Sequence, residues 1–214
     1  MEFHYFHKWL NNLVMINHKY KLIFIHIPRT GGSSIEKAIL NNNSSWWKIH
    51  APSKHLTAYS AKKIYQPYWD DYLKFTFVRN PWDRMVSMLK YGNFYGVNLN
   101  KNKKIIAKDY LKYFKKIEYD RRFFNLKQFE DIKTINNSVY SNIMGDELNF
   151  IGKFENIEDD FNTLTTLVGL PQINLPKIET SQRKTDYRDY YDIESKLFIE
   201  KIYKLDIEKF NYNF

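Results

Sequence analysis

Residues 26–39 read HIPRTGGSSIEKAI and follow a short apolar run at residues 22–25. The run is short, apolar and rich in strand formers, which predicts a buried strand. Behind it, Ser33 and Glu36 have the spacing of a capping box, so we expect a helix to begin at Ser33. The first N–H groups of that helix would lie at the turn, where an anion is favoured. The stretch therefore predicts a loop that binds a phosphate-like group.

The residues of this loop fit an anion in several ways. Gly31 and Gly32 allow backbone conformations that are closed to other residues, and they bring N–H groups close to a ligand. A nucleotide-triphosphate P-loop carries Lys after its last glycine, whereas the cation here, Arg29, precedes the glycines. This order argues against ordinary ATP chemistry. The alternative is that the glycines only make a turn and that Ser33 only caps the helix. The expected binding residues are Arg29, Thr30, Gly31, Gly32, Ser33 and Ser34.

The composition limits the class of protein. A chain of 214 residues with 43% hydrophobic and 18% aromatic residues predicts one folded domain with a sizeable core. There is no cysteine, which excludes disulfides and thiolate metal sites and fits a reducing cytoplasm. No apolar stretch approaches the roughly 20 residues of a membrane-spanning helix, and the N-terminus does not resemble a signal peptide. We therefore expect a cytoplasmic protein that has no membrane partner.

The net charge of +9 is concentrated in one segment. Residues 101–122 contain nine Lys and Arg against three Asp and Glu. Such a segment suits an anionic partner, whether nucleotide, acidic glycan or nucleic acid. A solvated helical face is the equally weighted alternative.

Two further junctions between a strand and a helix follow. The strand expected at residues 73–78 leads into Arg79, after which Asn80 suits an N-cap and Pro81 the first helical position. A third strand is expected near residues 150–154, and Asn156 would cap the next helix. The apolar face of that helix would be Ile157, Phe161, Leu164 and Val168.

Strands that alternate with capped helices imply a parallel sheet covered by helices. The predicted fold is α/β, a single domain over residues 1–214 with a central parallel sheet. We expect an N-terminal extension at residues 1–20 and a basic helical insertion at residues 101–122, whose helix would cover residues 101–116. A last helical segment is expected at residues 190–210, with Phe198, Ile202 and Leu205 in register.

The loop resembles the 5′-phosphosulfate loop of sulfotransferases, commonly P-K-x-G-G-[TS]-S in this branch. The sequence FTFVRNPWDRMVSML resembles their 3′-phosphate motif, which has Arg at the strand end and Ser eight residues later, here Arg79 and Ser87. The resemblance covers most of residues 21–214. The sequence most resembles the carbohydrate-type sulfotransferases, a family that includes the heparan 2-O and chondroitin enzymes, and in particular its compact bacterial members.

This resemblance implies transfer of a sulfuryl group from 3′-phosphoadenosine 5′-phosphosulfate (PAPS) to an acceptor hydroxyl, with no metal ion, in a P-loop-type sulfotransferase fold. One position departs from the family pattern, because Arg29 stands where the loop Lys is usual. Arginine stays charged and presents a planar fork, so it can still bind the phosphosulfate and stabilise the leaving oxygen. It cannot give up a proton, so acid assistance from Arg29 is not expected.

The transfer needs a base for the acceptor hydroxyl, and His55 is the candidate. The stretch KHLTA around it resembles the K-H-[AV]-[TS] stretch that carries this base in the family. The alternative is that His55 caps a helix starting at Leu56, and His50 is the reserve candidate. His26 would be a packed residue or a support behind the site.

Other candidate residues are basic. Arg183 and Lys184 resemble a loop that closes over the 3′-phosphate, and Arg84 could reach a phosphate or form a salt bridge on its own helix. The acceptor is expected to be a small molecule or a glycan. Two other functions stay open, an ATP- and Mg²⁺-dependent phosphotransferase and a basic nucleic-acid-binding protein built around residues 101–122.

Overall fold

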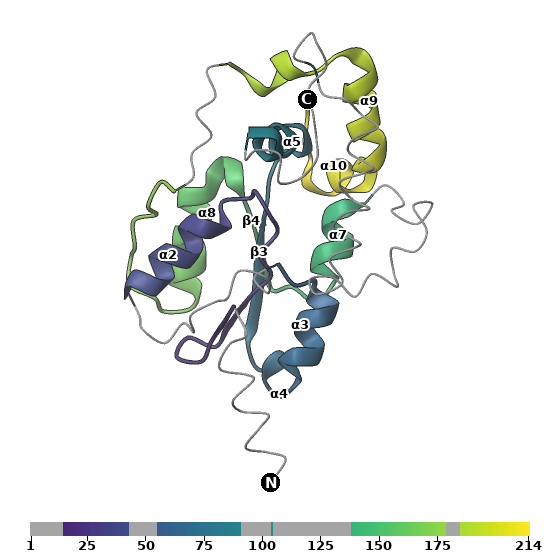
Figure 1. The fold of residues 1–214 in the computed structure, drawn as a ribbon. Coiled ribbons are helices and arrows are strands. Elements are labelled where there is room, and N and C mark those ends of the chain that lie inside the picture. Colours follow the sequence, from purple (N-terminus) through teal and green to yellow (C-terminus); the bar gives the residue numbers. More distant parts are fainter. Residues whose placement is uncertain (1–14, 43–54, 91–103, 105–137, 179–184) are drawn as a thin grey trace. The chain divides into compact units, whose positions relative to one another are not determined.

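The computed structural model describes residues 15–42, 55–90, 104, 138–178 and 185–214 (Figure 1). Contacts divide the chain into two compact units. We call residues 1–78 and 143–178 the sheet unit, and residues 79–142 and 179–214 the helical unit.

The sheet unit contains four strands in the order β1-β2-β3-β4. Strands β2, β3 and β4 are parallel, which confirms the expected parallel core of an α/β fold. Strand β1 runs antiparallel to β2, so the sheet is mixed and not wholly parallel. Only four residues join β1 to β2, too few for the crossover that a parallel pair needs. The strands are β1 (Ile16–Asn17), β2 (Leu22–Phe24), β3 (Leu73–Val78) and β4 (Phe150–Lys153).

Strand β1 also corrects the expected N-terminal extension. The extension was expected to cover residues 1–20, yet Ile16 and Asn17 pair with Ile23 and Leu22 of β2. Residues 1–14 lie outside the described part of the chain.

Helices cover both faces of the sheet. On one face, Phe24 and Phe75 belong to a core cluster that includes Ile35 of α2 and Phe161 of α8. On the other face, Lys74 alternates with Phe75 in the pleat and donates from Nζ to the backbone oxygen of Trp69 in α4, at 3.0 Å. The helices of this unit are α2 (Gly32–Asn42), α3 (Ala58–Ile64), α4 (Gln66–Trp69), η4 (Phe154–Asn156) and α8 (Ile157–Leu167).

Helix α8 largely follows its sequence pattern. Its expected apolar face packs on the core, and Gly169, at φ +68°, follows its end. Asn156 occupies the N-cap position, but its side chain makes no capping hydrogen bond. The carboxylate of Asp160 instead accepts from the N–H of Lys153 at 2.5 Å. The helix start was therefore predicted correctly, and the side-chain cap was wrong.

The helical unit differs from its prediction at the C-terminal segment. The expected continuous helix is broken at Tyr203, and its buried face is not the expected one, because Leu205 is 48% exposed. Within residues 193–210, the buried residues are Ser195, Ile199, Tyr203, Asp206 and Phe210. The elements are α5 (Pro81–Lys90), η5 (Tyr187–Tyr190), α9 (Ile193–Ile202) and α10 (Lys204–Phe210), and α7 (Val139–Met144) begins in this unit.

Asp206 explains why α10 turns this face inward. Its carboxylate accepts from the N–H groups of Tyr140 and Ser141, at 2.8 and 3.2 Å, and from the hydroxyl of Ser138 at 3.0 Å. These donors lie at the start of α7, where N–H groups lack partners within the helix. Burial raises the pKa of Asp206 above its ordinary value, although these hydrogen bonds act in the opposite direction.

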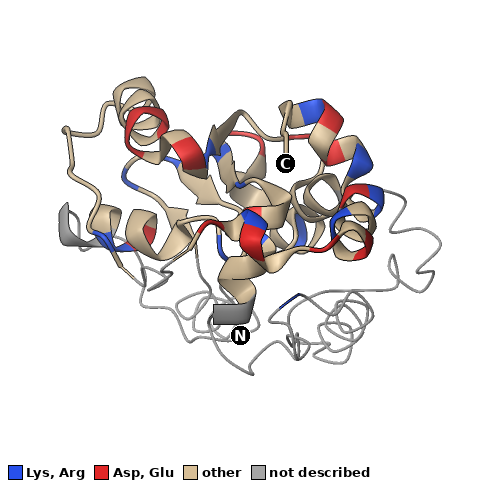
Figure 2. Cartoon of the chain, turned by 90° about the horizontal axis from the view of Figure 1, so that it is seen from above, with Lys and Arg blue, Asp and Glu red and all other residues tan. Residues whose placement is uncertain are grey.

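Charge along the last two helices is mixed. Lys and Arg (blue) and Asp and Glu (red) both occur along α9 and α10 in Figure 2. In the basic segment of residues 101–122 only Lys104 is described, so the expected insertion and its helix lie outside the described residues. The single-domain organisation stays a prediction. Within the described residues, no helix combines the length and the apolar character that crossing a membrane requires.

Candidate functional site

The connection from β2 to α2 is the predicted phosphate-binding loop. Its backbone is left-handed at Arg29, with φ +66°, and at Gly31, with φ +86°. Thr30 is buried, and its hydroxyl donates to the backbone oxygen of Ile27 at 2.8 Å. The N–H of Ser34 donates to the oxygen of Gly31 at 3.0 Å, which closes the turn into the helix. The strand, tight turn and helix were thus predicted in the correct order.

The start of α2 differs from the prediction by one residue. The helix begins at Gly32, so Ser33 lies inside the first turn and not at the N-cap. The hydroxyl of Ser34 accepts from the N–H of Ile178 at 3.4 Å. The carboxylate of Glu36, the expected second member of a capping box, lies 2.6 Å from Nδ1 of His26. The side chain that the local pattern assigned to capping thus contacts a residue ten positions earlier in the chain.

The two glycines are explained by packing as well as by ligand approach. A Cβ atom on Gly32 would lie 2.1 Å from Nε2 of His26, and one on Gly31 would lie 2.3 Å from Cδ1 of Ile157. Neither position has room for a side chain. Gly31 also needs its positive φ, which L-residues rarely adopt. The sequence offered no signal for the packing of His26 and Ile157 against these glycines.

His55, the predicted base, contacts His26, which lies between β2 and the loop of residues 29–34. Its Nδ1 lies 3.0 Å from the backbone oxygen of His26, and the two rings are 4.5 Å apart at 63°. A carbonyl oxygen can only accept, so Nδ1 of His55 carries the hydrogen, and in the neutral ring Nε2 is the basic nitrogen. This is the protonation state that a general base requires.

The capping alternative for His55 is wrong. Helix α3 begins at Ala58, and Thr57 caps it by accepting from the N–H of Ser60 at 3.2 Å. His50, the reserve candidate, lies outside the described residues.

The second junction follows its sequence pattern closely. Helix α5 begins at Pro81, and Asn80 caps it through Oδ1, which accepts from the N–H groups of Trp82 and Asp83 at 3.1 and 3.3 Å. The signals here are local, because Asn favours the cap and Pro the first helical position. The N-cap and the first helical residue are both confirmed.

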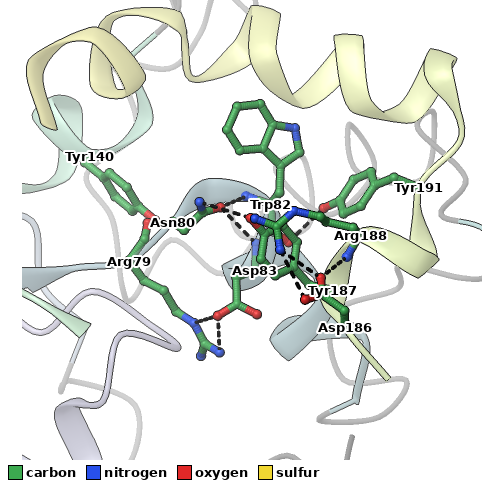
Figure 3. A network of polar contacts seen from close by, with 9 residues as sticks. All are labelled: Arg79, Asn80, Trp82, Asp83, Tyr140, Asp186, Tyr187, Arg188 and Tyr191. Carbon is green, nitrogen blue, oxygen red and sulfur yellow. Dashed lines mark hydrogen bonds and ion pairs between the residues drawn. The ribbon is translucent and has the colours of Figure 1, made fainter. Parts of the chain in front are cut away.

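Arg79, the predicted 3′-phosphate residue, is held by Asp83. Its Nε donates to Oδ2 of Asp83 at 2.8 Å, and its Nη2 lies 2.7 Å from the same oxygen (Figure 3). Both residues are buried. The backbone oxygen of Arg79 also accepts from the hydroxyl of Tyr140. Burial raises the pKa of Tyr140 well above its usual value, so this hydroxyl stays protonated. The guanidinium plane and the backbone of Arg79 are thus both fixed.

The other candidates on α5 lie inside the helical unit. Ser87 is buried, and so is Arg84, whose Nη1 donates to the hydroxyl of Tyr203 at 2.6 Å. The guanidinium carbon of Arg84 also lies 5.5 Å from the ring centre of Tyr140. Neither contact was predicted for Arg84. A buried guanidinium among tyrosines depends on long-range contacts, which helical spacing does not encode.

Sequence reasoning missed the contacts of residues 213 and 214. Nδ2 of Asn80 donates to the backbone oxygen of Asn213 at 2.8 Å. The ring of Phe214 lies 5.5 Å from that of Trp82 and 5.5 Å from that of Tyr191. Figure 3 shows how Tyr191 reaches the start of α5, where its hydroxyl donates to the backbone oxygen of Trp82 at 2.8 Å. The cap of α5 is therefore also a tertiary anchor.

The predicted residues fall into two groups. The loop and His55 lie together in the sheet unit, whereas Arg79 and Ser87 lie on or beside α5 in the helical unit. Arg183 and Lys184 lie outside the described residues, so their expected role stays a prediction.

Comparisons with known proteins address the family. The crystal structure of mouse sulfotransferase SULT7A1 complexed with PAP matches over 97% of this chain and 94% of that chain, with 13% identity and a TM-score of 0.39. A comparison with curated protein sequences finds no match. A model of the Sulfotransferase family matches residues 12–213, nearly the whole chain. The chain belongs to the sulfotransferase family, and the predicted enzyme class is confirmed.

Proposed function

We propose that this sulfotransferase moves a sulfuryl group from PAPS to a hydroxyl of a carbohydrate acceptor. The observation that carries the proposal is the hydrogen bond from Nδ1 of His55 to the backbone oxygen of His26, at 3.0 Å. It leaves Nε2 as the nitrogen that can take a proton, next to a loop of the phosphosulfate type. In a sulfotransferase, that combination supplies a base beside the donor.

The proposed step balances as an in-line displacement. The acceptor oxygen bonds to sulfur, the bond from sulfur to the phosphate oxygen of the donor breaks, and Nε2 of His55 receives the acceptor proton. Negative charge grows on the released phosphate oxygen. Arg29 would stabilise that charge, because a preorganised cation is worth most where charge develops in the transition state.

The donor would be distinguished by its 3′-phosphate. Arg79 and Ser87 are the proposed ligands, with Arg183 and Lys184 closing over the phosphate. The two contacts from Asp83 hold the guanidinium of Arg79 in one plane, which reduces the entropy lost on binding. A hydrogen bond between charged groups contributes roughly 1.5–3 kcal/mol, or about one to two decades of affinity.

The acceptor and the location are inferred from the composition and from single segments of the sequence. The basic residues 101–122 favour an acidic glycan, and Trp46 and Trp47 suit stacking on sugar rings. The lack of cysteine fits a reducing compartment, and the proposal therefore includes a cytoplasmic location.

Calorimetry with two nucleotides tests the donor. We expect adenosine 3′,5′-bisphosphate to bind at least about tenfold more tightly than adenosine 5′-monophosphate. Arg79→Ala should remove most of this difference. Lys204→Ala, which removes one exposed charge from the same unit, should leave the difference intact. Equal affinity of the wild-type protein for both nucleotides would refute the donor assignment.

A transfer assay with labelled PAPS tests the base and the acceptor. The acceptors should include glycans, phenols and lipids, and EDTA should leave the rate unchanged. His55→Ala should lower turnover about 10²–10⁴-fold. His18→Ala, a histidine of the same unit bonded at Nδ1 to Tyr72, should change it little. A His55→Ala variant within a few-fold of wild type would remove His55 as the base.

A further inference from the structure

We propose that His26 and Glu36 form a positioning pair that aligns the base His55 with the loop of residues 29–34. The inference rests on the proposed function, because it assigns the pair a role in the same reaction. His26 itself takes no proton from the acceptor in this scheme. It acts through its contacts with the loop and with His55.

Glu36 fixes the orientation of the His26 ring. Nδ1 of His26 lies 2.6 Å from Oε1 of Glu36, and the side chains are 3% and 14% exposed. A carboxylate only accepts, so Nδ1 of His26 is the donor. One face of the ring is also covered, since it stacks on Phe24 with ring centres 5.2 Å apart and planes at 9°. A buried ring held by a carboxylate and a stacked aromatic has one orientation.

That orientation sets the course of the loop. The edge of the ring, Nε2, Cδ2 and Cε1, lies within 2.1 to 2.7 Å of the place where a Cβ of Gly32 would be. The ring therefore fills the side-chain position of the first residue of α2. If the ring turned away, the loop backbone at Gly32 would lose its support on that side.

The same residue holds the base. The backbone oxygen of His26 accepts from Nδ1 of His55 at 3.0 Å, and the His55 ring meets the His26 ring edge-on at 4.5 Å. The tautomer of His55 and the placement of its Nε2 thus both depend on His26. A partner that orients a functional histidine through its second nitrogen commonly matters 10–100-fold, as metal-binding histidines show.

Two substitutions at Glu36 separate orientation from packing. Glu36→Leu keeps a large helix-forming side chain but removes the acceptor, and we expect kcat to fall about 10–100-fold with a smaller change in KM for the acceptor. Glu36→Gln keeps an amide oxygen that can accept from Nδ1, so it should stay within about threefold of wild type. Glu158→Leu, the same change at an exposed helical position of the sheet unit, is the matched control and should leave kcat unchanged.

Nitrogen NMR of the imidazole rings gives a measurement that does not depend on activity. In the wild-type protein, His55 should carry its hydrogen on Nδ1 and His26 should carry one on Nδ1. Glu36→Leu should mix the tautomers of His55, and Glu36→Gln should restore the wild-type spectrum. A wild-type His55 protonated on Nε2 alone would overturn the inference even if Glu36→Leu did not fold. So would a Glu36→Leu variant with wild-type kcat and an unchanged His55 spectrum.

The two proposals can fail separately. If the protein transfers no sulfuryl group but the histidine spectra respond to Glu36 as expected, the proposed reaction is wrong and the positioning of His55 stands. If transfer occurs and Glu36→Leu leaves both kcat and the spectra unchanged, the reaction stands and the positioning pair is wrong.

Discussion

Gly31→Ala should destabilise the protein far more than Gly169→Ala, although both glycines have positive φ. Their φ angles are +86° and +68°, so the left-handed backbone lowers the stability of either alanine variant by about 1–2 kcal/mol. The surroundings differ. A Cβ on Gly31 would lie 2.3 Å from Cδ1 of Ile157 and 3.0 Å from Cδ2 of Phe154, whereas a Cβ on Gly169 would meet no atom within 4 Å.

The difference isolates the packing of the loop. Forcing a methyl group into an occupied core costs typically about 1–3 kcal/mol. Gly31→Ala should therefore lose about 2–5 kcal/mol in total and Gly169→Ala about 1–2 kcal/mol. Both glycines lie in the sheet unit, so urea unfolding followed by fluorescence reports them against the same background. Changes in unfolding free energy that agree within about 0.5 kcal/mol would refute the packing argument, since this is the usual size of a neutral surface change.

Other substitutions test particular contacts. Tyr65→Phe should leave stability unchanged or raise it by up to about 1 kcal/mol, because the buried hydroxyl has no hydrogen-bond partner among the described residues. In the same thermal unfolding measurement, Tyr140→Phe should lose about 1–3 kcal/mol, because it removes the donor to the backbone oxygen of Arg79. Asn80→Ala should cost about 0.5–2 kcal/mol, because it removes the oxygen that caps α5; an unchanged free energy of unfolding in urea would contradict the cap. Burial raises the pKa of Asp206, so its contribution to stability is complete below the ordinary carboxyl pKa of about 3.9 and is lost as the pH rises through the raised value. Asp206→Asn should flatten the stability profile above that ordinary pKa, and an unchanged slope would contradict the raised pKa.

The strand-to-helix junctions were predictable because their signals are local. Asn80 and Pro81 act on the N–H groups and the φ angle of the residues beside them, so their spacing alone indicated the helix start. Sheet order and the antiparallel pairing of β1 required contacts between distant segments. Such contacts leave no mark in a single sequence.

Where local and distant contacts compete, the local rule fails. The capping-box spacing of Ser33 and Glu36 was present, yet Glu36 contacts His26, which lies ten residues earlier. The carboxylate gains a charge-assisted hydrogen bond in a buried setting, which is roughly twice as strong as a hydrogen bond between neutral groups. The same competition shifted the buried face of the C-terminal helices, where Asp206 takes up the N–H groups at the start of α7.

The candidate base shows how far separate motifs depend on one another. In the sequence, 21 residues separate Gly32 from the KHLTA stretch, and the two motifs are interpreted independently. In the fold, one residue between the strand and the loop joins them: the ring of His26 occupies the space above Gly32, and its backbone oxygen selects the tautomer of His55. A substitution at His26 should thus disturb donor binding and proton transfer together. Substitutions at Arg29 or His55 should affect mainly one of them.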